Sequence, residues 1–278
     1  MRRKNKEKRL EKVYTDEERE VALANLKSYN YCGRVWLLGR ARVNSPQIVR
    51  LMKVRALTYR KVCLEIASSI NKLKEKNVLD VGCGTSEYQE WLAENCARLF
   101  GVDISVEMLR LCRHDKGKSI ELIAADAMHL PFKDGAFDLT TIFQSLHHVP
   151  NWQKALKEMV RTSKQVSLYE PNGDSIFHRL MHLIRGREKR FKQTNEDYNL
   201  VEYQASGFSP TMITCFLKRK SMITCTYMSD ILPVSLLEKL SRRSPRVLFI
   251  VFTAEDFIRK IPILRNQLGN MLIIGSLV

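Results

Sequence analysis

The chain has 278 residues, of which 45% are hydrophobic, and it carries a formal net charge of +16. This apolar content is enough for a sizeable core, which excludes an intrinsically disordered protein. Seven scattered cysteines show neither metal-ligand spacing nor a disulfide framework, and no apolar run approaches the roughly 18 residues of a membrane span. We therefore expect a globular protein with reduced thiols in a cytoplasmic setting, with no metal site and no transmembrane segment.

The first 73 residues are expected to precede the main domain. Residues 1–13 contain seven Lys or Arg and two Glu, so this basic tail is predicted to be disordered. Over residues 14–73 we expect a helical cap. One helix begins at Thr15, which is followed by acidic residues suited to a first helical turn, and a longer one begins at Ser45. A single domain is then expected over residues 74–278.

The first predicted strand, residues 77–81, leads directly into a glycine loop. Its apolar run is typical of a parallel strand covered on both faces. Gly82 and Gly84 permit a tight turn and the close approach of a ligand to the backbone. A dinucleotide fingerprint would need glycine where Glu87 stands, and no Gly-Lys-Ser/Thr of a Walker loop follows. The loop is therefore not predicted to bind a pyrophosphate.

Two further predicted strands also end in a carboxylate. The strand over residues 98–103 ends in Asp103, and the strand over residues 120–126 ends in Asp126. Asp103 follows Asp80 at close to the roughly 20-residue offset at which a carboxylate meets a ribose diol in doubly wound folds. Carboxylates along one edge of a sheet favour a cationic cofactor over a phosphorylated one. S-adenosylmethionine, which carries sulfonium and ammonium groups, fits this pattern.

A fourth predicted strand, residues 137–143, leads into Gln144-Ser-Leu-His-His148-Val. Three earlier segments accompany it: Val78-Leu-Asp-Val-Gly-Cys-Gly-Thr-Ser, Gly101-Val-Asp-Ile-Ser and Ala125-Asp-Ala-Met-His-Leu-Pro-Phe. Together these segments resemble the class I S-adenosylmethionine-dependent methyltransferases, in the type 11-like subgroup with His-His-Val after the fourth strand. The resemblance extends over about residues 70–172.

The resemblance implies a cofactor site along the strand ends. Asp80 and the glycine backbone would hold the methionine end, Asp103 would bind both ribose hydroxyls, and Asp126 with the Ala127 backbone would read the adenine edge. The full set of implied cofactor-binding residues is Asp80, Gly82, Cys83, Gly84, Asp103, Ile104, Asp126, Ala127 and Gln144.

The remaining elements complete an α/β fold. Further strands are predicted over residues 164–169, 221–228 and 271–277, with helices beginning at Asn151 and Ser209. The fold class is a doubly wound, seven-stranded, mostly parallel sheet with N-terminal helices and helical insertions, and the last strand is expected to be antiparallel. Insertions are expected at about residues 187–206 and 233–266, the second with two amphipathic pieces, 233–240 and 254–261, around the apolar run 247–252.

Methyl transfer places few demands on side-chain chemistry. The sulfonium already activates the methyl group, so the enzyme must mainly align the acceptor and, for some acceptors, remove a proton. His147 and His148 are the candidate general bases, and the alternative is that one of them packs and hydrogen-bonds the loop. For Glu170 the roles of orienting an acceptor and of capping the loop are both open.

Three functions remain open. The first is methylation of an O or C atom of a small-molecule or lipid-linked acceptor, because many enzymes of the resembled subgroup do this and the run 247–252 is suited to line an apolar pocket. The second is RNA (tRNA) methylation, which the basic charge favours although no RNA-binding domain is recognisable. The third is a non-catalytic S-adenosylmethionine-binding scaffold. Peripheral contact with an anionic phospholipid surface is a further expectation, beside the plain alternative of a solvated basic face.

Overall fold

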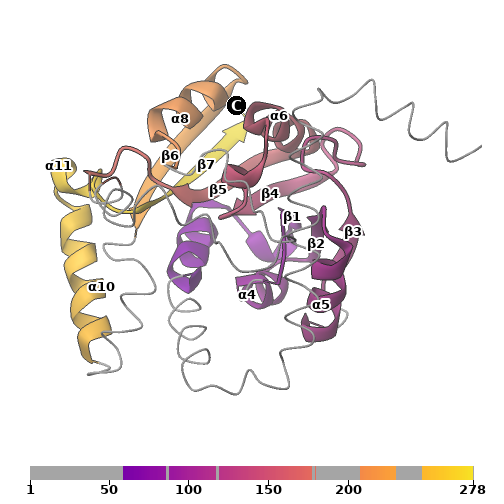
Figure 1. Ribbon diagram of the computed structural model, residues 1–278, viewed down its shortest axis with the longest axis horizontal. Helices are drawn as coiled ribbons and strands as arrows, with labels where there is room; N and C mark the ends of the chain where they lie inside the picture. The colour runs from indigo at the N-terminus through magenta and orange to yellow at the C-terminus, as the bar shows by residue number, and fades with distance from the viewer. Residues whose placement is uncertain are drawn as a thin grey trace, which may run out of the picture.

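Seven strands form one sheet in the computed structural model, which describes residues 59–85, 88–116, 119–176, 179, 207–229 and 246–277 (Figure 1). The strand order is β3-β2-β1-β4-β5-β7-β6. β7 is antiparallel to both of its neighbours, and the pairings from β3 to β5 are parallel. The predicted fold class is confirmed. The strands are β1 (Asn77–Val81), β2 (Arg98–Asp103), β3 (Glu121–Ala124), β4 (Phe137–Phe143), β5 (Ser163–Pro171), β6 (Met222–Ser229) and β7 (Asn270–Leu277).

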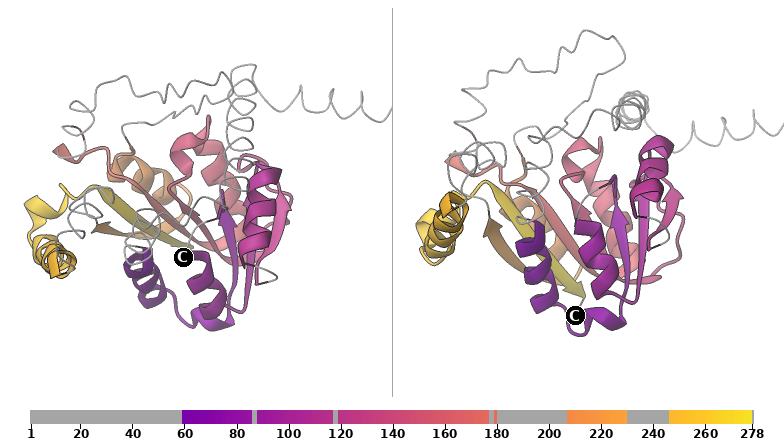
Figure 2. Two further views of the ribbon diagram at one scale, coloured as in Figure 1. Left: turned by 60° about the horizontal axis from the view of Figure 1, so that its bottom comes forward. Right: turned by 90° about the horizontal axis from the view of Figure 1, so that it is seen from below.

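Helices cover both faces of the sheet, as Figure 2 shows. Side chains alternate along a strand, so Leu79 and Val81 of β1 enter one apolar cluster and Val78 enters the other. The first cluster includes side chains of α6 (Trp152–Thr162) and α8 (Pro210–Lys218). The second includes side chains of helical residues 59–69, of α4 (Tyr88–Asn95) and of α5 (Val106–Lys116).

Two helix starts follow the predicted capping chemistry. The Asn151 side chain accepts a hydrogen bond from the Lys154 backbone N–H at 3.1 Å and caps α6. α8 begins with Pro210 directly after Ser209, where the missing N–H of proline is tolerated in a first turn. Short 3-10 turns lie at η2 (Leu73–Glu75) and η3 (Leu146–His148).

The parallel register aligns four strand ends at one edge. Val81 of β1 lies opposite Val102 and Ile142, so β1 ends level with β2 and β4. In the same way, Asp103 lies opposite Ala124. The predicted carboxylates therefore gather at the carboxyl edge, as the sequence indicated.

Two element predictions need correction. β3 ends at Ala124 rather than at Asp126, because the chain then turns and the His129 N–H donates to the Asp126 carbonyl oxygen at 2.9 Å. The apolar run 247–252 is not flanked by a separate piece beginning at Ala254. Both lie in one continuous helix, α10 (Arg246–Arg259), which is followed by the short α11 (Pro262–Arg265).

Several predictions lie outside the described residues. These are the tail 1–13, the helix from Thr15, the beginning of the helix from Ser45, the insertion at 187–206 and the amphipathic piece 233–240. Helical residues 59–69 agree with the later part of that second helix. Within the described ranges, no helix has both the length and the apolar character needed to cross a membrane.

Candidate cofactor and active site

The two loop glycines have different surroundings. Both have positive φ angles, 63° for Gly82 and 48° for Gly84. A Cβ on Gly82 would lie 2.0 Å from Ser145 Oγ, so this glycine lets the loop pack against the end of β4. A Cβ on Gly84 would meet nothing closer than Met108 Cε at 3.7 Å. Backbone approach by a ligand is thus open at Gly84 and closed at Gly82.

Asp103 joins the glycine loop to the end of β2. Its Oδ2 accepts a hydrogen bond from the Gly84 N–H at 3.0 Å, and its Oδ1 accepts one from the Ser105 N–H at 2.8 Å. Burial raises the pKa of Asp103 above its usual value, although these backbone N–H groups act to lower it. Each carboxylate oxygen has a second lone pair, so the group can still accept two hydroxyl donors. Ile104, half-buried, follows directly.

Asp80 lies beneath the glycine loop, fully buried. The Tyr88 hydroxyl lies 2.9 Å from both carboxylate oxygens, and Gln89 Nε2 donates to Oδ2 at 3.1 Å. Gln89 Nε2 also donates to the carbonyl oxygen of Cys83, whose side chain is buried. Burial raises the pKa of Asp80 to about 7, with a further contribution from the charge of Asp103. The carboxylate predicted to hold the methionine end therefore bonds α4 side chains in this structure.

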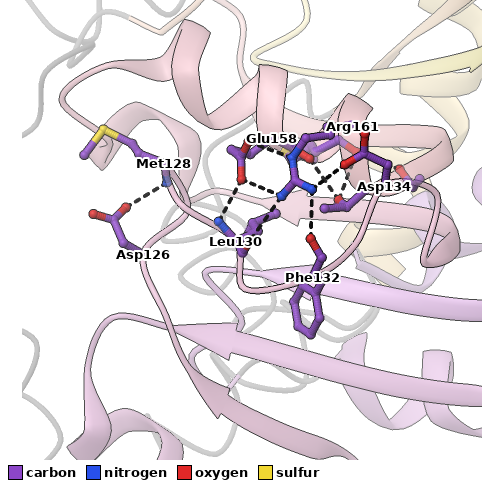
Figure 3. A network of polar contacts seen from close by, with 10 residues as sticks. Asp126, Met128, Leu130, Phe132, Asp134, Glu158 and Arg161 are labelled. Carbon is purple, nitrogen blue, oxygen red and sulfur yellow. Dashed lines mark hydrogen bonds and ion pairs between the residues drawn. The ribbon is translucent and has the colours of Figure 1, made fainter. Parts of the chain in front are cut away.

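The loop that carries Asp126 is fixed by an arginine of α6 (Figure 3). Arg161 donates to the carbonyl oxygens of Phe132 at 2.8 Å and Leu130 at 3.1 Å. It also pairs with Glu158 at 2.8 Å, and Glu158 Oε2 accepts the Leu130 N–H at 3.0 Å. Although partial burial acts to raise the pKa of Glu158, hydrogen bonds and charge from Arg161 lower it overall.

Asp126 begins this loop and turns it back. Its Oδ1 accepts the Met128 N–H at 2.8 Å, and both Asp126 and the adjacent Ala127 are half-buried. The stabilising pair of α6 was not predicted. Its one sequence signal is the i, i+3 spacing of Glu158 and Arg161, which is common on helices and does not identify a loop partner.

Gln144 connects the end of β4 to β7. Its φ angle is 50°, its backbone N–H donates to the Tyr169 carbonyl oxygen at 2.7 Å, and its side-chain Nε2 donates to Asn270 Oδ1 at 3.0 Å. The side chain predicted to contact the cofactor thus also spans two strands of the sheet.

A buried carboxylate holds the segment after Gln144. Glu170 Oε1 accepts the backbone N–H groups of Ser145 at 2.9 Å and Leu146 at 2.8 Å, and Oε2 lies 2.7 Å from His147 Nδ1. Glu170 is fully buried and His147 is 9% exposed. His148 is half-buried, with its ring centroid 4.0 Å from that of His147. Glu170 therefore caps the loop, and His147 is one of the groups that it binds.

The charge balance of the strand ends suits a cationic ligand. Asp80 and Asp103 form no ion pair with any Lys or Arg of the described residues. Asp103 accepts a hydrogen bond from the glycine loop directly, and Asp80 is linked to the loop through Gln89. Two uncompensated carboxylates near an open backbone at Gly84 favour ammonium and sulfonium groups. The residues present therefore fit S-adenosylmethionine. No cluster of three or more metal-ligating side chains occurs among the residues that could be searched.

A sequence model of the family described as "Methyltransferase domain" matches residues 79–168, which contain the contacts of Asp80, Asp103 and Asp126 described above. This part of the chain is therefore similar in sequence to a methyltransferase domain. The resemblance seen in the sequence and the expected cofactor, S-adenosylmethionine, are confirmed at the level of this family.

Among curated proteins, a demethylmenaquinone methyltransferase of Staphylococcus epidermidis is 38% identical over 104 residues. The match covers 36% of this chain and 43% of the relative, so it spans less than half of the relative's length. A demethylmenaquinone methyltransferase of Listeria welshimeri is 39% identical over 98 residues, which are 33% of this chain and 42% of the relative.

A solved structure shares the fold at low identity. Magnesium protoporphyrin IX methyltransferase from Synechocystis, solved with bound SAH, has a TM-score of 0.54 and 13% identity, over 83% of this chain and 87% of that chain. At this identity the likeness extends to the fold alone.

A separate cavity of about 960 Å³ lies toward the outer side of the sheet. Residues of β6, α8, α10 and α11 contribute to its wall, together with Asn172 after β5 and Glu65. Its charged side chains are balanced, with Arg259, Lys260 and Arg265 facing three carboxylates, so the lining does not select for one sign of charge.

Proposed function

We propose that the methyltransferase domain transfers a methyl group from S-adenosylmethionine to an O or C atom of a small-molecule or lipid-linked acceptor. The observation that carries this proposal is the Asp103 carboxylate, fixed by two backbone N–H groups beside the open Gly84. The acceptor class is supported by the 38% identity to a protein named for a demethylmenaquinone acceptor. The free thiols of the described cysteines suit the proposed cytoplasmic setting.

Each residue of the strand-end site has a separate task in this proposal. When bound, S-adenosylmethionine supplies an electrophilic methyl group. Asp103, which the Ser105 N–H orients, would accept the two ribose hydroxyls, and the Asp126 turn would hold the adenine. Gly84 lets the methionine part approach the backbone, and Asp80 supports that loop from below through Gln89. Catalysis then consists mainly of alignment of the acceptor with the methyl group.

The two histidines are assigned different roles. His147 is held by the Glu170 carboxylate, so we assign it the positioning of the Leu146–His148 turn rather than proton transfer to an acceptor. His148 is the remaining candidate for a general base. Replacing His148 by Asn is expected to remove a limb of the pH profile of kcat while the melting temperature stays unchanged. Replacing His147 by Asn is expected to lower the melting temperature by several degrees, because Glu170 then loses a buried partner.

RNA methylation is the second candidate, and the net charge of +16 is the observation that favours it. Methyl-tritiated S-adenosylmethionine offered with an organic-solvent extract of membranes and, separately, with purified tRNA distinguishes the two acceptors. We expect label in the organic-soluble fraction and none in the tRNA. Incorporation into tRNA by the parent chain and not by an Asp103→Ala variant would replace the first proposal by the second.

Cofactor binding is tested by calorimetry on Asp103→Ala. Loss of two hydrogen bonds to a carboxylate should weaken S-adenosylmethionine binding by about 2 to 3 kcal/mol, or roughly 30- to 150-fold. Asp174→Ala is the matched control, because that carboxylate is partly exposed, pairs with Arg179 and lies outside the site. If Asp103→Ala folds and binds as tightly as the control, the cofactor placement is wrong.

A further inference from the structure

One face of α10 exposes apolar side chains to solvent. Phe249 is 75% exposed, Ile250 63% and Phe257 65%. With Thr253 and Ala254, which are also exposed, these residues recur at i, i+1, i+4, i+5 and i+8, the spacing of one helical face. We call these five residues the α10 outer face. Scattered exposed apolar residues are ordinary on a protein surface, whereas a continuous face with two phenylalanines is not.

The opposite side of α10 is anchored to the domain. Glu255 is buried and lies 3.6 Å from Lys61 Nζ, while Arg259 lies 3.2 Å from Glu65. Lys61 Nζ also sits 4.6 Å from the centre of the Phe252 ring. These contacts with helical residues 59–69 fix the rotation of α10 about its axis, so the outer face points away from the domain. In Figure 1 the helix lies at the outer margin of the molecule.

Basic residues adjoin α10 along the sequence on both sides. The sequence over residues 239–246 contains four Lys or Arg and no acid, and it leads into the first residue of α10. After the helix come the exposed Lys260 and Arg265, which also line the cavity beside β6 and for which no ion pair is found within the described ranges. Asp256 borders the face but is paired with Lys61 and Arg259. Among the described residues that border the face, the charges outside ion pairs are therefore positive.

We propose that the α10 outer face docks the protein on an anionic lipid bilayer, with Phe249, Ile250 and Phe257 inserted among the acyl chains and the flanking basic groups at the headgroups. An amphipathic surface helix with aromatic residues on one face and Lys or Arg beside it binds the membrane interface in this way. Juxtaposed basic residues add attraction to acidic lipids. A protein partner would need acidic groups to match the same rim, but a bilayer supplies both the apolar layer and the negative charge.

The test is cosedimentation of the full chain with vesicles, with no methyl-transfer readout, so it stands apart from the proposed function. Vesicles of phosphatidylcholine alone are compared with vesicles containing about a third phosphatidylglycerol. We expect binding to the anionic vesicles and about tenfold weaker partition for Ile250→Asp and for Phe257→Asp. Ile223→Asp, on β6 and 68% exposed, is the matched control and should bind within about twofold of the parent.

Thermal melting of each variant checks folding, and an unchanged melting temperature is expected because the replaced side chains contact mainly solvent. The proposal fails if the parent chain does not bind anionic vesicles, or if the two α10 variants bind like Ile223→Asp. Light scattering addresses a second copy as the occupant. A dimer that Ile250→Asp dissociates, without vesicle binding by the parent, overturns the lipid proposal. A large loss of melting temperature in both α10 variants, again without vesicle binding, means that the chain itself covers this face and overturns it as well.

Discussion

The loops after β2 and β3 are held by a different kind of polar contact from helix α10. At the ends of β2 and β3, the Asp103 carboxylate accepts the N–H groups of Gly84 and Ser105, and the Asp126 carboxylate accepts that of Met128. Near β6, α10 is held by ion pairs between side chains, such as Arg259 with Glu65. Backbone-directed bonds fix the path of a loop, whereas side-chain pairs hold an element in place and leave its outer surface unconstrained.

The family match follows the same division. It covers residues 79–168 and ends within β5, so α8, α10 and the antiparallel strands lie beyond it. We call the elements before residue 168, where the cofactor site is proposed, the cofactor half and the elements after it the outer half; the family model describes only the cofactor half. Two measurements test the cofactor half itself, and a third compares it with the outer half.

The largest effect should come from pH and Asp80. Its folded-state pKa of about 7 lies above the ordinary value of 3.8. The stabilising contribution of the protonated group is fully present below 3.8 and is lost as pH rises through about 7. That rise in pKa corresponds to at most about 4 kcal/mol of unfolding free energy. Between pH 4 and pH 8 the parent should lose stability relative to Asp80→Asn, as followed by urea denaturation of both proteins. Parallel pH profiles would contradict the buried, cation-free setting of Asp80.

A second measurement separates backbone strain from packing in the glycine loop. Gly82 and Gly135 have nearly equal φ angles, 63° and 61°, but only at Gly82 would a Cβ collide with a neighbour. Gly135→Ala should lower the free energy of unfolding by about 1 kcal/mol through backbone strain alone. Gly82→Ala should lose about 3 kcal/mol, because the collision with Ser145 adds an overpacking term. Equal losses in chemical denaturation would show that the loop can move away from Ser145.

The third measurement compares one arginine from each half. Arg161 and Arg259 are similarly exposed, at 28% and 25% of the side chain, and each pairs with an acid three residues away. Arg161→Ala should lower the free energy of unfolding by about 2 to 3 kcal/mol, because two carbonyl oxygens of the Asp126 loop then lose their hydrogen-bond donor. Arg259→Ala should lower it by about 1 kcal/mol or less. Cofactor affinity should also fall in Arg161→Ala and stay constant in Arg259→Ala. A larger loss of stability or affinity in Arg259→Ala would contradict the proposed difference between the two halves.

Much of the sheet could be predicted from sequence because its apolar runs have the period and length of buried strands. The gathering of the strand ends could also be predicted, because parallel strands place Asp103 and the Asp126 turn at one edge of the sheet. The partner of Asp80 could not be read in this way. Val78 and Asp80 point to the same face of β1, but only the packed structure shows that α4 presents Tyr88 and Gln89 there.

The outer half was harder to predict for a different reason. The apolar run 247–252 fits a pocket lining as well as a surface helix, because periodicity alone does not say which side of an apolar helix is covered. Its orientation depends on the pairs that Lys61 and Arg259 make across about 190 residues of sequence, a separation at which local patterns carry no information. Likewise, the roles of Glu158 and Arg161 depend on where the Asp126 loop lies.

The position of β7 between β5 and β6 has a consequence for the order of folding. β5 pairs with β4 along one edge, but its other edge is completed only when Asn270 meets Pro171 and the strand pairs along to Ser276. Closing so long a stretch of chain is slow compared with local pairing. Until then β5 presents Val166 and Leu168 on an unpaired strand, which can add to a like strand of another chain. Refolding yield should therefore fall as protein concentration rises.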